Sequence, residues 1–238
     1  MSGAAAWRSA AKDAGRVFER LDWQRLGELY FHWGGADFWS EKRPQVLELG
    51  AALGEQLAKR VDRGGSSLWV GAGVAELPVL LGEVGALGRT VIATNLRAEE
   101  CDVLNEGLAA ALPACPLRYV AADARVAGVA PFDHLGCISV FTDPETWPVL
   151  SDVAYGRMAP VQLPVEQFVA EREQARALAK ALLARLRRPG LVTITAEEVA
   201  WLLEAAAEVG DTIDADEELV ATAVVGDPVG WLRVTAPA

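Results

Sequence analysis

The first quarter of the chain combines two stretches of helical periodicity with an aromatic segment between them. Apolar residues are spaced as in a helix in residues 9–30, and they recur at steps of three and four in residues 46–57. Segment 30–39 is rich in aromatic residues but contains two adjacent glycines, which do not continue a helix easily. We therefore predict two helices joined by an aromatic loop.

Beyond residue 63 the pattern changes to short apolar runs separated by helical stretches. The runs, typical of strands, occupy residues 68–70, 90–94, 117–122, 135–141 and 191–195. Helical periodicity fills residues 77–84, 104–112 and 168–186. Because strand and helix alternate, we expect a mostly parallel sheet whose two faces are covered by helices in right-handed crossovers.

The C-terminal part adds a helix and a pair of strands. Residues 195–198 have the pattern of a capping box, in which a hydroxyl and a carboxylate satisfy free amides at a helix start. Apolar runs 219–225 and 229–234 flank a Gly-Asp-Pro turn and predict an antiparallel hairpin. Since no repeat or low-complexity linker interrupts the chain, we divide it into a helical N-terminal extension or lid, residues 1–63, and one domain, residues 64–238.

The composition argues against several classes of partner. The chain has 238 residues and a formal net charge of −11, which opposes nucleic acid at long range. The longest stretch without charged residues, 64–75, is shorter than the roughly 18–20 apolar residues of a membrane span. The 3 cysteines and 2 histidines match neither a disulfide framework nor a zinc motif, so we expect no metal site. Without a signal-peptide pattern, a cytoplasmic location is expected by default.

A set of short motifs follows the predicted strands in a fixed order. The first strand runs into Leu68–Gly73, Asn95 ends the second, Ala122–Ala124 follow the third, and Phe132-Asp133 precede the fourth. In this order the chain resembles class I S-adenosylmethionine-dependent methyltransferases over residues 66–235. The resemblance implies an α/β, Rossmann-like, doubly wound fold. Its sheet has seven mostly parallel strands, with helices on both faces and a C-terminal antiparallel hairpin.

The glycine turn after the first strand discriminates between cofactors. Gly71 and Gly73 leave room for a ligand to approach the backbone, with free amides at a helix start. A dinucleotide fingerprint needs a third glycine at position 76, where this chain has Glu76. A carboxylate there would repel a pyrophosphate but suits the sulfonium and ammonium groups of S-adenosylmethionine. The plainer alternatives are a tight turn and an acid that complements the helix dipole.

The resemblance implies a cofactor site made from residues that follow the strands. These residues are Gly71, Ala72, Gly73, Glu76, Asn95, Leu96, Asp123, Ala124 and Ser139. Asp123 would accept a bond from the adenine amino group, and Asn95 would accept a ribose hydroxyl, more weakly than the acid usual in the family. Each could instead be a local turn residue. Trp69 and Ala75 also depart from the family pattern, in place of an acid and a glycine.

Candidates for the catalytic residue are few. Methyl transfer is an in-line displacement, and a general base matters only when the acceptor carries a proton. His32, in the aromatic segment, and Tyr155, after the fourth strand, are the candidates for such a base. His134 falls at the opposite end of the fourth strand and is interpreted as structural. Asp143 and Pro144 are interpreted as the N-cap and first residue of a helix.

The resulting hypothesis is an S-adenosylmethionine-dependent methyltransferase acting on a small molecule. Two alternatives stay open at this point. The chain could be a non-catalytic binding or interaction protein that keeps the fold, or it could transfer another group from the same cofactor. The aromatic residues near the N-terminus could form a lid or a homodimer contact, and the sequence does not choose between them.

Overall fold

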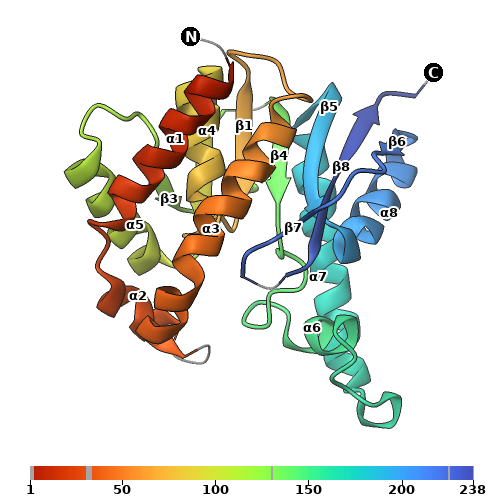
Figure 1. Ribbon diagram of the computed structural model, residues 1–238. Coiled ribbons are helices and arrows are strands. Elements are labelled where there is room, and N and C mark those ends of the chain that lie inside the picture. Colours follow the sequence, from red (N-terminus) through yellow and green to blue (C-terminus); the bar gives the residue numbers. More distant parts are fainter. Residues whose placement is uncertain (1–2, 31–33, 130, 225, 238) are drawn as a thin grey trace.

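The molecule is a central sheet between two layers of helices (Figure 1). The computed structural model describes residues 3–30, 34–129, 131–224 and 226–237. The strands are β1 (Ser66–Val70), β2 (Thr90–Asn95), β3 (Tyr119–Ala121), β4 (Phe132–Cys137), β5 (Leu186–Thr195), β6 (Thr212–Ala215), β7 (Val220–Ala221) and β8 (Pro228–Thr235).

The sheet follows the order β3-β2-β1-β4-β5-β8-β6, and β7 also pairs with β8. Strands β1 to β5 pair in parallel, whereas β8 is antiparallel to β5, β6 and β7. The predicted α/β, mostly parallel sheet is therefore confirmed. Within the described residues it has eight strands rather than the expected seven, because the edge strand β6 was not predicted.

Eight α-helices are found in the described part of the chain. They are α1 (Gly3–Phe18), α2 (Trp23–Leu29), α3 (Gly35–Leu57), α4 (Leu77–Leu87), α5 (Ala98–Ala111), α6 (Pro148–Ala154), α7 (Val165–Ala184) and α8 (Val199–Val209). Short 3-10 turns occur at Pro160–Gln162 and Ala196–Glu198. Helices α1, α3, α4 and α5 cover one face of the sheet, and α7 and α8 cover the other (Figure 1).

The alternation of side chains along β1 explains why both faces must be covered. Trp69 packs into one core with Val17 of α1 and Leu80 of α4. Its neighbours in β1 point the other way, and Leu68 packs with Leu182 of α7. Since successive residues of a central parallel strand are apolar, exposing either face would cost hydrophobic free energy.

The N-terminal helices differ from the prediction. Residues 9–30 form two helices, because the Asp22 carboxylate accepts the Arg25 N–H at 3.0 Å and starts α2 as an N-cap. Helix α3 begins at Gly35, so Trp39 lies in a helix rather than in the predicted loop. Both α1 and α3 pack on α4. The division of the chain at residue 63 stays a prediction.

The C-terminal hairpin is only partly as predicted. In the run 219–225, Val220 and Ala221 pair with β8, and Val225 lies outside the described residues. The longer outer partner of β8 is β6, which the sequence analysis missed. Strand β6 is an edge strand with mostly exposed side chains, so it lacks the apolar run by which a buried strand is recognised.

Strands β4 and β5 also begin earlier than expected. Strand β4 ends at Cys137 because Ser139 takes a left-handed conformation (φ 53°), which an extended strand cannot contain. Strand β5 starts at Leu186, ahead of the Pro-Gly pair, and its register against β4 shifts between Phe132 and His134.

No described helix is both long and apolar enough to cross a membrane.

Candidate functional site

A cavity of about 830 Å³ opens at the carboxyl ends of the parallel strands. Its size is within the range of small-molecule pockets. The predicted cofactor residues that line it are Gly71, Gly73, Glu76, Asn95, Leu96, Asp123, Ala124 and Ser139. Ala72 is buried beneath the turn and does not line the cavity. Tyr155 lines it, while His32 lies outside the described residues.

The glycine turn needs glycine for two different reasons. Gly71 has φ +65°, a conformation that strains other residues, and a side chain there would extend toward Val140 across the cavity lining. At Gly73 a Cβ atom would lie 2.5 Å from Glu100 Oε1, so a carboxylate takes the space of the missing side chain. The turn thus keeps one backbone face open to the cavity and presses the other against a buried acid.

Glu76 occupies the amide that a phosphate would need. The Gly73 N–H donates to Glu76 Oε2 at 2.8 Å, and Glu76 is the residue that directly precedes α4. Burial raises the pKa of Glu76 to about 7, against the opposing effect of this hydrogen bond, and Glu100 adds to the rise. The helix start is therefore prepared for a cationic or neutral group and not for a pyrophosphate.

Glu100 is a buried acid that the sequence analysis did not single out; it does not line the cavity but bonds to two residues that do, Tyr30 and Asn95. It is fully buried and accepts the Tyr30 hydroxyl at 2.8 Å and the Asn95 Nδ2–H at 3.1 Å. Burial raises its pKa above the ordinary value. Its position in α5, one turn after the end of β2, is the only sequence signal that could have drawn attention to it.

Asn95 uses most of its hydrogen-bonding capacity within the protein. Its amide also donates to the Ala72 carbonyl at 3.0 Å, and its oxygen accepts the Arg97 N–H at 2.9 Å. The turn interpretation of Asn95 is therefore satisfied by the geometry. A ribose contact, which would use the second lone pair of Oδ1, stays a prediction.

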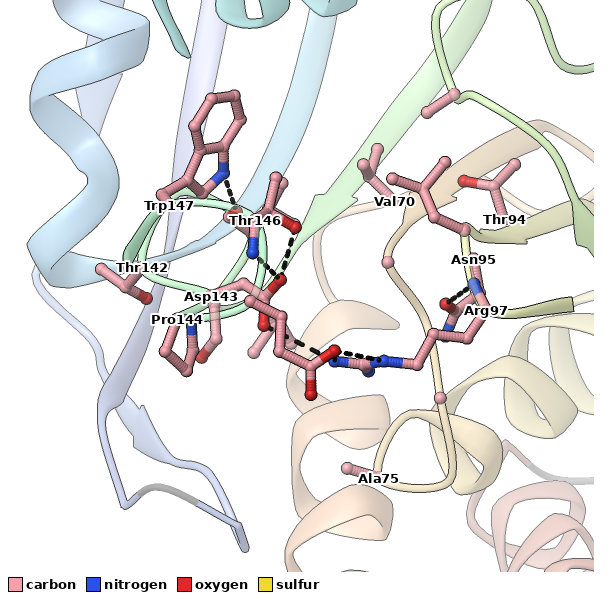
Figure 2. Close-up of a pocket in the computed structure, with 18 of the residues that line it drawn as sticks. Val70, Ala75, Thr94, Asn95, Arg97, Thr142, Asp143, Pro144, Thr146 and Trp147 are labelled. Atoms are coloured by element: carbon pink, nitrogen blue, oxygen red, sulfur yellow. Dashed lines mark hydrogen bonds and ion pairs between the residues drawn. The ribbon is translucent and has the colours of Figure 1, made fainter. Parts of the chain in front are cut away.

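Arg97, the second residue after β2, reaches across the cavity to the loop that follows β4. Figure 2 shows its guanidinium pointing toward that loop. It lies 2.8 Å from Glu145 and 3.7 Å from Asp143, and it stacks over the Tyr30 ring at 5.5 Å. This ion pair connects two edges of the cavity, and the sequence analysis missed it because the partners are far apart in the chain.

Asp123 is held in a local turn. Its carboxylate accepts the backbone N–H of Arg125 at 2.8 Å and pairs with the Arg125 guanidinium. The Arg125 contact lowers the pKa of Asp123, so this carboxylate is ionised at neutral pH. The side chain is about one-third exposed, at 34%. It borders the cavity, but its predicted contact with an adenine amino group remains a prediction.

The capping-box interpretation of residues 195–198 is wrong. The Thr195 hydroxyl accepts the Ser139 N–H at 2.7 Å instead of capping its own helix. Glu198 Oε1 accepts the N–H groups of Phe141 and Thr142 at 2.7 and 2.8 Å. These tertiary bonds hold the loop after β4, because its backbone amides have no strand partner there.

The helix predicted from Asp143 begins later than expected. Helix α6 starts at Pro148, and Asp143 instead closes a turn by accepting the Thr146 N–H at 3.1 Å. The Trp147 indole N–H donates to the Val140 carbonyl at 2.8 Å and fixes the end of this loop (Figure 2). The loop therefore presents Asp143 toward Arg97 rather than toward a helix axis.

Comparison with known proteins identifies the fold and not a close relative. No family model matches the chain, and no curated protein matches it significantly. Magnesium protoporphyrin IX methyltransferase from Synechocystis PCC 6803, solved with bound SAM, aligns with TM-score 0.51 and 15% identity over 90% of this chain and 97% of that one. Precorrin-6y C5,15-methyltransferase from Geobacter metallireducens aligns with TM-score 0.50 and 12% identity, over 80% and 88%. A methyltransferase from Pyrococcus furiosus gives TM-score 0.50 and 12% identity, over 79% and 83%.

The chain has the class I methyltransferase fold. Within this fold, Trp69 replaces the acid that the resemblance implies before the first glycine. Its indole N–H donates to Glu83 Oε1 at 2.5 Å, and its ring lies over Gly136, where a Cβ atom would be 2.2 Å from Trp69 Cε3. Trp69 is buried and does not line the cavity, so this large residue leaves the cavity open.

Proposed function

We propose that the chain is an S-adenosylmethionine-dependent methyltransferase that acts on a small molecule. The observation that carries the proposal is Glu76 bound to the Gly73 amide, at a glycine turn that opens into a large cavity. This arrangement rejects the phosphates of a dinucleotide and accepts a ligand with positive groups. The fold supports the same conclusion, because the three solved structures compared above are named methyltransferases.

The residues of the cavity fit this cofactor. Gly71 leaves space for it between the end of β1 and Val140, and Glu76 would face its ammonium group. Leu96 and Asp123 would hold the adenosine part, since both line the cavity and Leu96 is 71% exposed. The bound cofactor would supply an activated methyl group. The chain itself would hold the acceptor in line and exclude water.

The charges around the cavity favour a small acceptor over a polyanion. The three arginines that line it are all paired: Arg97 with Glu145 at 2.8 Å, Arg125 with Asp123, and Arg157 with Asp152 at 3.5 Å. Phosphate recognition needs unpaired cations, and the net charge of −11 repels polyanions. A cytoplasmic location and a homodimer are retained as further proposals.

Calorimetry with S-adenosylhomocysteine tests the proposal directly. We expect one-to-one binding of S-adenosylhomocysteine and no binding of NAD, which shares the adenosine but adds a pyrophosphate. Heat from NAD alone, or from neither ligand at millimolar concentration, would contradict a cofactor site of this kind.

A non-catalytic binding protein is the second candidate. The specific observation in its favour is that Asn95 and Arg97 are already engaged with other residues of the chain. Transfer of a labelled methyl group from S-adenosylmethionine to any small acceptor would exclude it. Binding of the cofactor without transfer to a broad set of metabolites would favour it.

A further inference from the structure

The cavity contains a second polar cluster, built by other elements than the glycine turn. Tyr155, which ends α6, and Thr142, in the loop after β4, both line the cavity. The Tyr155 hydroxyl donates to Asp227 Oδ2 at 2.6 Å, and Asp227 directly precedes β8. The Thr142 hydroxyl lies 3.4 Å from the Tyr155 oxygen. Three separate segments therefore meet around one phenol group.

The lone pairs of the Tyr155 oxygen remain open. Its single hydrogen goes to Asp227, and the Thr142 hydroxyl donates to Glu198 Oε1 at 2.8 Å. The Arg157 guanidinium lies over the ring, 4.9 Å from its centre, and so contacts the face and not the oxygen. Among the residues that the structure describes, no group donates to this oxygen. A ligand in the cavity can therefore donate a hydrogen bond to it.

We propose that Tyr155 and Asp227 receive the proton of the methyl acceptor, and that the acceptor is an apolar molecule with a neutral hydroxyl group. This inference rests on the proposed function and adds the substrate class. In this cluster the group that lines the cavity is a neutral phenol, and the Asp227 carboxylate lies one hydrogen bond behind it. A cationic amine would be matched by a carboxylate in direct contact. Apolar side chains in the cavity lining, including Trp147, Leu178 and Val224, suit the apolar body of such an acceptor.

The proton transfer balances without any further reactant. The acceptor hydroxyl donates to the Tyr155 oxygen, which positions the acceptor. As the acceptor oxygen bonds to the methyl carbon, its proton passes to Tyr155 while the proton of Tyr155 passes to Asp227. The electron pair of the broken carbon–sulfur bond stays on sulfur, so a sulfonium and a carboxylate become a neutral thioether and a carboxylic acid. Tyr155 touches the acceptor, and Asp227 is a positioning residue that acts through it.

Tyr155 is suited to pass a proton on rather than to lose one. Burial and the Asp227 carboxylate raise its pKa to about 12, so it stays protonated through the neutral range. It therefore begins and ends the step as a neutral phenol.

The test compares acceptors that carry a proton with one that does not. Phenol, catechol and 1-naphthol keep their hydroxyl proton in mildly alkaline buffer, whereas 4-nitrophenol is ionised. The variants are Tyr155→Phe, which keeps the ring over Arg157, and Asp227→Asn, which keeps an oxygen that can accept from Tyr155. The control is Asp152→Asn, on the same helix, whose carboxylate lies 3.5 Å from Arg157 and does not line the cavity.

We expect both variants to lower the rate of methylation of the protonated phenols 10²- to 10⁴-fold, which is the usual contribution of general base catalysis. The rate of methylation of 4-nitrophenol should fall less than tenfold. In protein saturated with S-adenosylhomocysteine, calorimetry should show phenol binding two- to tenfold weaker in Tyr155→Phe, from loss of one hydrogen bond, and unchanged in Asp227→Asn. Asp152→Asn should match the original protein throughout.

Three results would overturn the inference. Equal losses for protonated and ionised acceptors would mean that the pair only holds the structure together. Methylation of amines or thiols but of no phenol would refute the substrate class, as would S-adenosylhomocysteine binding with no phenol bound or methylated. Failure of the unaltered protein to bind S-adenosylhomocysteine would instead refute the proposed function, and this inference with it.

Discussion

The two ends of the central strands hold similar polar residues in opposite surroundings. At the amino ends, the side chains of Glu83 and Arg89 are fully buried, 2.9 Å apart, and Ser67 and His134 bond to each other at 3.1 Å. At the carboxyl ends, Glu76 and its neighbours border a cavity of about 830 Å³. The first set is closed by its own partners, whereas the second leaves acceptor atoms open. Buried charge alone does not mark a functional site; an adjoining cavity does.

The histidine at the closed end illustrates the difference. His134 Nε2 lies 2.8 Å from the Thr193 hydroxyl, and both ring nitrogens have partners. Burial and the nearby Arg89 lower its pKa well below the ordinary value, so it stays neutral and fixed. Its structural interpretation from sequence agrees with these contacts.

Breaking the closed network should have the largest effect. Arg89→Met removes the partner of Glu83 and leaves a buried carboxylate unpaired, so the free energy of unfolding should fall by about 3–5 kcal/mol in urea titrations. Arg187→Ala is the control, because Arg187 is 57% exposed and approaches Asp133 only at 3.7 Å. It should change stability by less than about 1 kcal/mol. Similar losses in the two variants would contradict the distinction.

The second-largest effect should be a pH dependence of stability that comes from Glu198. Burial raises its pKa from 4.5 to about 7, so folding favours the protonated form, and this contribution to stability is lost as the pH rises through 7. Glu198→Gln removes the titration. As the pH rises from 4 to 8, the free energy of unfolding of the variant should increase by about 3 kcal/mol relative to that of the original protein.

The comparison must be made between the two proteins at each pH. His134 acts in the opposite direction, because its lowered pKa makes the fold less stable as the pH falls below its unfolded value. Thermal melts of both proteins across this range isolate Glu198. A constant difference between them would show that the carboxylate is already ionised at low pH.

A pair of glycines separates backbone strain from loss of the pocket. Gly71 (φ +65°) and Gly64 (φ +72°) have the same conformation, but Gly64 is at the closed end with open space around it. Alanine at either position should cost about 1 kcal/mol of stability. Only Gly71→Ala should weaken S-adenosylhomocysteine binding, by tenfold or more in calorimetry. Equal binding by both variants would remove Gly71 from the site.

The smallest effect is expected at Asp123. Its pair with Arg125 is between side chains 54% and 34% exposed, so Arg125→Ala should change stability by less than about 1 kcal/mol. Because Asp123 then has no competing partner, the Arg125→Ala variant should bind S-adenosylhomocysteine slightly more tightly than the original protein. The Asp123→Ala variant should bind it more weakly. The opposite order of affinities would assign Asp123 to the local turn alone.

Local pattern was enough to predict the parallel sheet and the glycine turn, since apolar runs and glycine spacing are properties of adjacent residues. It failed where tertiary contacts decide the outcome. The sequence places Glu198 in a capping box, but in the structure its carboxylate bonds to backbone amides of the loop after β4. Strand β6 is too exposed to show an apolar pattern. Arg97 and Asp227 have their partners far along the chain, so their contacts with Glu145 and Tyr155 could not be predicted.

The central claim is that the cavity at the carboxyl ends of the strands holds an adenosyl ligand. A crystal structure of the protein grown with S-adenosylhomocysteine tests it most directly. We predict ligand density between Gly71 and Asp123, with the ligand's ammonium group beside Glu76. Ligand density elsewhere on the molecule would contradict the account. So would a cavity that contains only solvent in crystals grown at a saturating concentration of S-adenosylhomocysteine.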